Sequence, residues 1–361
     1  MWTSRTAFTA IAVAVLATAC GGGGDDAPVA PPAPTYVKIS AANQDEVARV
    51  SIASIVALVA VPVAGPSAAP ALAKATQAGA TSTLAGSTGL THLIRRVLDV
   101  GSGQTTAAGL ARPLAQLPPE TILCSVSGSF TTTLDDKDNS KTLSVGDSVS
   151  ISFNKCDEGD GPVNGGMGLT IATYSATPTS EALTGSITFQ SLSITSAPLL
   201  FVANGGASFN ISAAQTATGF DMLTGFTVAS GGLTLAKQAL ATGAVLDSLA
   251  FRAGFTVSDR DFSPAVQGGT YWEEITASGD FGSQSLGGDL TLSTITPFKS
   301  VYTDPFGDIF PTEGQLLVSG RDGTKLRLSA TQTVQVLMEM SDDSDADWES
   351  TKFVTWDWLL S

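Results

Sequence analysis

The chain has 361 residues and a formal net charge of −15, although charged side chains make up only 14% of it. A surface this acidic repels the phosphates of nucleic acids, so nucleic acid is not expected as a partner. The aromatic content of 7% argues against the aromatic girdles that a membrane-spanning barrel carries at both interfaces.

The first 19 residues have the features of an export signal peptide. Arg5 gives a positive start, Phe8 to Leu16 form an apolar run, and small residues follow as far as Ala19. The apolar run is shorter than the roughly 20 residues that a membrane-spanning helix needs. Cys20 stands directly after the small residues, and the whole segment resembles a bacterial lipobox.

The lipobox resemblance implies that Cys20 is the lipidated, N-terminal residue of the mature protein, where it carries fatty acyl chains such as palmitate. It also implies a destination, since Gly21 in the next position favours the outer membrane. We therefore expect a lipid-anchored outer-membrane protein, on its periplasmic or its surface face. Residues 20–35 are rich in Gly and Pro and are predicted to be a tether between lipid and fold.

Residues 36–120 are predicted to be an Ala-rich, partly helical lead-in. Asn43, followed three residues later by Glu46, is typical of a capped helix start, and a helix is expected from about Gln44 to Ala60. Because its apolar residues lie almost all round, we expect this helix to pack under the domain that follows. A second, short helix is predicted around Leu90 to Leu98, after a linker of small residues.

Residues 121–361 are predicted to be one β domain. Apolar residues recur at every second position, as in Val149, Ile151 and Phe153, which predicts strands with one buried and one Ser/Thr-rich face. About twelve to fourteen such runs are separated by turn residues, and Asp322-Gly323 predicts a hairpin. The expected fold is an all-β, large antiparallel meander that closes as a barrel, a partly open barrel or a sandwich.

Cys124 and Cys156 remain as a pair if Cys20 takes the lipid. In the oxidising compartment that an exported chain reaches, they are predicted to form a disulfide. The segment from Cys124-x-x-x-Gly128 to Asn164-Gly165 is similar to a pattern in uncharacterised β-rich lipoproteins of Gram-negative bacteria. That resemblance implies no activity.

Two acidic loops are candidate Ca²⁺ sites. In the first, side-chain oxygens follow the spacing by which a twelve-residue loop wraps Ca²⁺, which resembles EF-hand or dockerin-like loops. The second has acids at alternate positions. The alternative for both is a solvated hairpin end that discourages edge pairing. The candidate ligands are Asp136, Asp138, Ser140 and Asp147 in the first loop and Asp343, Asp345 and Asp347 in the second.

Signals for catalysis are weak. Adjacent Glu273 and Glu274 point to opposite faces of a strand, so a hydrolase would need a different partner, such as Asp261 or Asp280. His92 is the single histidine, and the chain has no Gly-x-Ser-x-Gly motif that would supply a serine nucleophile beside it. No catalytic residue is therefore predicted.

The sequence thus predicts a lipid-anchored envelope protein with a non-enzymatic binding or structural role. It contacts the membrane through the lipid, and an apolar ligand or an envelope protein is a possible partner. No cofactor is expected, apart from Ca²⁺ at the acidic loops. Three alternatives stay open: a carrier of a lipid or acyl chain in a barrel lumen, a hydrolase built on acidic residues, and a Ca²⁺-stabilised surface adhesin.

Overall fold

A computed structural model describes residues 34–59, 119–139, 144–157, 161–177, 179–196, 198–265, 269–303, 310–331, 334–345 and 347–360. The prediction of an all-β antiparallel meander is confirmed, because 15 strands form one sheet. Cys20, His92 and the second expected helix lie outside the described residues.

The elements, in chain order, are α1 (Gln44–Val59), β1 (Glu120–Leu123), β2 (Ser127–Asp135), β3 (Ser148–Asp157), β4 (Val163–Thr177), β5 (Ser180–Ser196), β6 (Leu199–Gln215), β7 (Gly219–Ala239), β8 (Val245–Phe251), β9 (Thr256–Pro264), β10 (Tyr271–Ser283), β11 (Gly288–Tyr302), β12 (Glu313–Ser319), the 3₁₀ turn η1 (Arg321–Gly323), β13 (Lys325–Ala330), β14 (Gln335–Ser341), β15 (Ser350–Thr355) and α4 (Trp356–Leu360).

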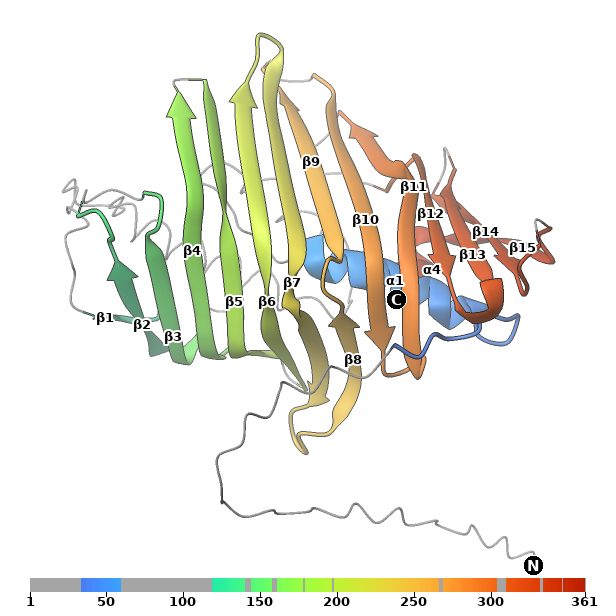
Figure 1. Ribbon diagram of the computed structural model, residues 1–361, viewed down its shortest axis with the longest axis horizontal. Helices are drawn as coiled ribbons and strands as arrows, with labels where there is room; N and C mark the ends of the chain where they lie inside the picture. Colours follow the sequence, from blue (N-terminus) through green and yellow to red (C-terminus); the bar gives the residue numbers. More distant parts are fainter. Residues whose placement is uncertain are drawn as a thin grey trace, which may run out of the picture. The chain divides into compact units, whose positions relative to one another are not determined.

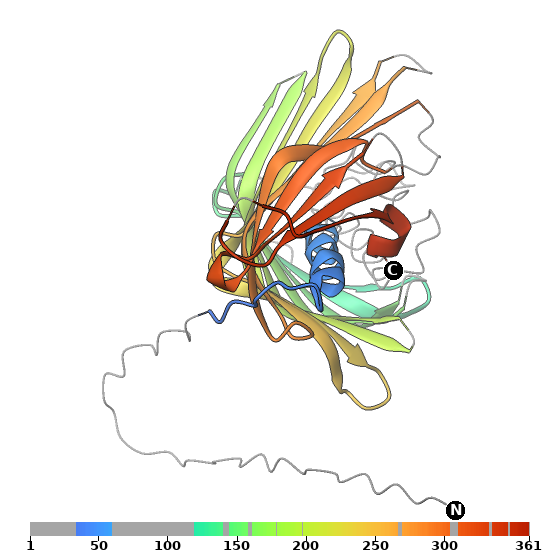
Figure 2. The same ribbon diagram turned by 90° about the vertical axis from the view of Figure 1, so that its right-hand side faces the viewer.

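Strand order follows chain order along almost the whole sheet (Figure 1). The exception lies in the middle, where β7 and β10 each pair with both β8 and β9. β8 and β9 therefore share one strand position, end to end. Within the described chain β1 and β15 end the path without pairing to each other, so the sheet is open, and it curves around α1 (Figure 2). Of the expected closures, the partly open barrel describes this arrangement.

The break between β8 and β9 turns Phe255 into the core. Its ring centroid lies 5.0 Å from that of Phe251 and 6.3 Å from that of Phe281, both edge-on. Gly279 of β10 has a φ of 124°, and a Cβ on it would lie 2.7 Å from the Phe255 Cα. Glycine at this position thus permits the close approach that buries the aromatic cluster.

Helix α1 is buried as predicted, and it begins at Gln44 and ends at Val59. It contacts β9, β13 and α4, and its apolar side chains join those of the strands in one core. Arg49 lies over the Trp358 ring of α4, 4.3 Å from its centroid. The expected cap differs, because Asn43 Oδ1 accepts from the upstream Ser40 N–H at 2.9 Å. Neither helix in the described ranges has the length and apolarity to cross a bilayer.

Thr35, the last residue of the predicted tether, is hydrogen-bonded to β11. Its N–H donates to Asp289 Oδ2 at 3.1 Å, and its carbonyl accepts from the Asp289 N–H at 2.8 Å. Asp289 is buried and pairs with Arg252 at 2.7 Å. Two residues on, the Val37 carbonyl accepts from the Arg321 N–H of η1 at 2.7 Å. The start of the described chain is thus fastened to β11 and to the turn between β12 and β13.

Two local predictions are confirmed. Cys124, just before β2, forms a disulfide with Cys156 of β3, and their Cα atoms lie 5.4 Å apart. Asp322 and Gly323 form the turn between β12 and β13, with φ values of 61° and 78°. Asp and Gly are among the residues that reach this left-handed region most easily, which is why the pair marks the hairpin in the sequence.

Candidate functional site

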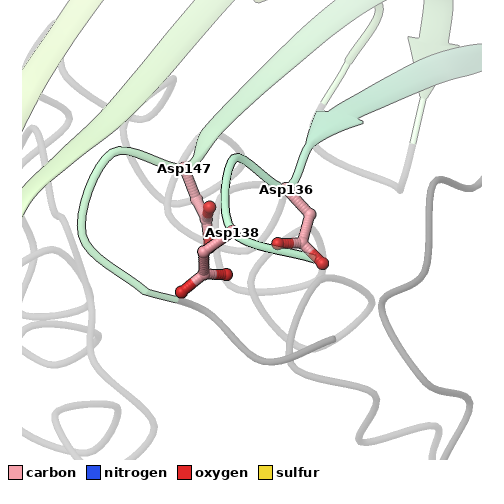
Figure 3. Close-up of side chains that lie close together, drawn as sticks. All are labelled: Asp136, Asp138 and Asp147. Carbon is pink, nitrogen blue, oxygen red and sulfur yellow. The ribbon is translucent and has the colours of Figure 1, made fainter. Parts of the chain in front are cut away.

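The first acidic loop joins β2 to β3 and gathers three carboxylates. One oxygen from each of Asp136, Asp138 and Asp147 lies within 4.8 Å of the others (Figure 3). We call these three residues the loop set. Asp136 and Asp147 are buried and Asp138 is exposed, while Ser140 lies outside the described residues.

Hydrogen bonds inside the loop account for the buried Asp147. Its Oδ1 accepts from the Lys137 N–H at 2.9 Å, and its Oδ2 accepts from the Ser144 N–H at 2.7 Å. The Ser144 hydroxyl in turn donates to Asp138 Oδ2 at 3.0 Å. Both oxygens of Asp147 therefore hold the two sides of the loop together, which explains its burial without an ion. Ca²⁺ binding by this loop stays a prediction.

The second acidic loop, between β14 and β15, spreads its predicted ligands along the chain. Asp343 Oδ1 accepts from the Asp345 N–H, and Asp345 Oδ1 accepts from the Asp347 N–H, each at 2.9 Å. These successive Asx turns use the carboxylates to cap the backbone. The carboxylates that do converge in this described stretch are those of Asp342, Asp343 and Glu349, all exposed. The expected trio of alternate acids is thus not brought together.

A third group of carboxylates lies on one face of the sheet, on β9 and β10. One carboxylate oxygen from each of Asp259, Asp261 and Glu273 lies within 4.8 Å of the others, and we call these residues the sheet set. Glu273 pairs directly with Asp261 across the two strands, and Asp259 lies two residues along β9 on the same face. The sequence suggests Asp261 only as one possible partner of Glu273, and Asp259 was missed. The sequence does carry a sign of Asp259: it follows Val257 by two residues, so it occupies a position of the strand where an apolar, buried residue is expected.

Two of the three acids in the sheet set are buried with no hydrogen-bond partner in the described chain for one oxygen, and Glu273 is half-buried. Asp259 is 5% exposed and Asp261 is 8% exposed, and within the described residues Oδ1 of each is buried with no hydrogen-bond partner. The basic residues on β9 and on β11, the neighbour of β10, point to the other face of the sheet. Arg260 pairs with Asp221 at 2.6 Å, and Lys299 pairs with Glu274 at 2.8 Å. No ion pair to the sheet set is found in the described part of the chain.

Burial makes the charged forms of these acids unfavourable. It raises the pKa of Glu273 to about 7, with the charge of Asp261 adding to the effect, and raises the pKa of Asp261 to about 6. Burial, then the charges of Glu273 and Asp261, also raises the pKa of Asp259 well above its usual range. Burial and the same three acids raise the pKa of Tyr302, whose ring stacks on Tyr271 at 5.4 Å.

The strands on either side complete the surroundings of the sheet set. Met222 of β7 lies opposite Asp261, and Ser300 of β11 lies opposite Glu273. Both flanking residues are buried, and α1 contacts β9. Three carboxylates in such a place can share protons or hold a cation. They are poorly placed as acid and base toward a large substrate, because two of them are more than nine-tenths buried.

No family model, no curated protein and no solved structure matches the chain. The resemblance to envelope lipoproteins therefore stays a prediction, and the candidate sites rest on the residues described above.

Proposed function

We propose that this protein is a lipid-anchored protein of the bacterial outer membrane, with a non-enzymatic binding or structural role. The observation that supports the proposal is that Thr35, the last residue of the predicted tether, is hydrogen-bonded to Asp289 of β11. A lipid on Cys20 would therefore attach the sheet to the membrane through the predicted tether.

Chain length limits how far the sheet can lie from such an anchor. About 14 residues separate Cys20 from Pro34, and an extended chain spans at most about 3.5 Å per residue. The sheet would therefore lie within roughly 50 Å of the membrane that holds Cys20. A distance of this order suits a protein that works at the membrane surface, and not one that delivers cargo across the periplasm.

The exposed face of the sheet supports a binding or structural role. Hydroxyl side chains form ladders across neighbouring strands, including Thr173 to Thr184 at 2.7 Å and Ser258 to Thr276 at 2.7 Å. Such a face stays hydrated, and it also carries the ion pairs Arg260–Asp221 and Lys299–Glu274. It suits a polar partner, such as another envelope protein, better than an apolar ligand.

The lipid-carrier alternative has less support. A carrier needs a continuous apolar lumen, whereas the inner faces of the strands share one packed core with α1. An acyl chain would have to displace well-packed side chains to enter, which costs the contacts they make. This alternative would gain support if α1 could move out and leave an apolar cavity for an acyl chain.

Fractionation of cells that express the Cys20→Ser variant tests the proposal. The unmodified protein is expected in the outer-membrane fraction with the mass of fatty acyl chains on its N-terminal peptide, and the variant is expected to lose both. Because Cys124 and Cys156 are bonded to each other, the double variant Cys124→Ser/Cys156→Ser is the matched control and should keep its lipid. A Cys20→Ser product that still sediments with membranes, together with an unmodified protein that carries no acyl mass, contradicts the proposal.

A further inference from the structure

We propose that the sheet set, Asp259, Asp261 and Glu273, binds one divalent cation of the size of Ca²⁺. The site is separate from the two acidic loops that the sequence singles out. It does not depend on the lipid anchor, so its test and that of the proposed function can fail independently.

The spacing of the oxygens fits one ion. Ca²⁺ lies 2.3–2.6 Å from its oxygen ligands, so two ligands on opposite sides of the ion are about 4.6–5.2 Å apart. The carboxylate oxygens of the sheet set lie within 4.8 Å of one another. Because these separations do not exceed the span across an ion of this size, the three oxygens can contact one Ca²⁺ without movement of the strands. Mg²⁺ demands near-ideal octahedral geometry and gives up its waters reluctantly, so a buried group of three carboxylates suits it less well.

The buried oxygens supply an independent reason. Oδ1 of Asp259 and Oδ1 of Asp261 are buried without a hydrogen-bond donor in the described chain, although almost all buried polar atoms in proteins have a partner. Both residues are more than nine-tenths buried. A cation between them would satisfy both atoms at once and would also balance their charge.

The charge balance points the same way. Three carboxylates face one buried spot, while the neighbouring Arg260 and Lys299 are engaged on the other face of the sheet. Buried charges in proteins are paired or coordinate a metal, or they become neutral by taking up protons. Carboxylate oxygens are the ligands that Ca²⁺ prefers, and no soft ligand is present in the sheet set.

The experiment uses the full chain, stripped of metal with EDTA and titrated calorimetrically with CaCl₂, MnCl₂ and MgCl₂ in turn. The test variant is Asp259→Asn/Asp261→Asn, which keeps the shape of both side chains. The matched control is Asp136→Asn/Asp138→Asn in the loop set. We expect the unmodified protein to bind one Ca²⁺. The test variant should bind Ca²⁺ at least about 10-fold more weakly, and the control should bind it as tightly as the unmodified protein does. Mn²⁺ should bind at the same site, and Mg²⁺ should bind there less tightly than Ca²⁺.

Thermal unfolding gives a second readout. At a Ca²⁺ concentration about 100 times the Kd, the Tm of the unmodified protein should rise by about 5 °C or more, and that of the test variant by less than about 1 °C. If the test variant does not fold, Glu273→Gln takes its place with the same expected loss. The proposal is overturned if the test variant binds Ca²⁺ as the unmodified protein does, or if none of the three ions binds or raises the Tm.

Discussion

The loop set and the sheet set each bring three carboxylates within 4.8 Å, yet their surroundings differ. In the loop, both oxygens of Asp147 accept hydrogen bonds from backbone N–H groups, and the Ser144 hydroxyl donates a hydrogen bond to Asp138. In the sheet, the backbone N–H groups are committed to strand pairing, so they are not available to Asp259 and Asp261.

The difference shows that proximity of acids alone does not mark a metal site. A buried carboxylate with all its oxygens satisfied is a structural element, and its removal should destabilise the fold. A buried carboxylate with an unsatisfied oxygen is costly by itself, and its neutralisation should stabilise the metal-free fold. The two sets are therefore expected to respond to substitution with opposite sign.

The largest effect is expected from the disulfide, which holds the far end of the β2–β3 hairpin that carries the loop set. Cys124→Ala/Cys156→Ala should lower the free energy of unfolding by about 3–4 kcal/mol, because the bridge joins residues 32 apart in sequence. Urea unfolding measures the loss. The Tm shift that Ca²⁺ causes through the sheet set should stay unchanged. A loss of that shift would show that the two regions do not behave independently.

Asp147→Ala should have the next largest effect. It removes the acceptors of two backbone N–H groups, on Lys137 and Ser144, and should lower the free energy of unfolding by about 2–3 kcal/mol. The control is Asp138→Ala, since that side chain is exposed and its loss should cost less than about 1 kcal/mol. Equal losses in the two variants, measured by urea unfolding, would refute the structural role of Asp147.

Glu273→Gln should act in the opposite direction. In EDTA at pH 8 it removes a charge that burial disfavours, so the free energy of unfolding should rise by about 1–2 kcal/mol. Its neighbour Glu274 is the control, because it lies on the other face and pairs with Lys299. Glu274→Gln should leave stability unchanged or lower it by less than about 1 kcal/mol. Destabilisation by Glu273→Gln in EDTA would contradict the account of the sheet set.

The pH dependence should be no larger than the effect of Glu273→Gln, because it comes from the same charge. Since the pKa of Glu273 is raised to about 7 in the fold, the folded state keeps a proton that the unfolded chain releases near pH 4.5. Stability from this group is therefore greatest below pH 4.5 and is lost as the pH rises through about 7. In EDTA, the unmodified protein should lose about 1–2 kcal/mol more than Glu273→Gln between pH 5 and pH 8. Urea unfolding at a series of pH values checks this, and parallel curves for the two proteins would refute it.

Much of the fold was predictable because its signals are local. Alternation at Val149, Ile151 and Phe153 gives the buried face of β3, and Asp322-Gly323 gives the β12–β13 turn. The apolar run after Gln44 predicts α1, and the expectation of an oxidising compartment predicts the pair Cys124–Cys156. Each of these depends on neighbours in sequence or on a count of residue types.

The shared strand position of β8 and β9 and the sheet set depend on contacts between distant residues. Nothing local shows that Gly279 leaves room for Phe255, or that β7 pairs with two later strands. Likewise, Asp261 and Glu273 meet only through the register of β9 on β10. The loop set was found because its acids are close in sequence, and the same criterion gave the alternate acids of the β14–β15 loop, which do not converge.

The most direct test of the difference between the two sets is a crystal structure of the full chain grown with MnCl₂, with anomalous diffraction data that locate Mn²⁺. The account predicts an anomalous peak among the carboxylates of Asp259, Asp261 and Glu273, at full occupancy and bonded to oxygens of at least two of them. A peak in the loop set with none in the sheet set would contradict it.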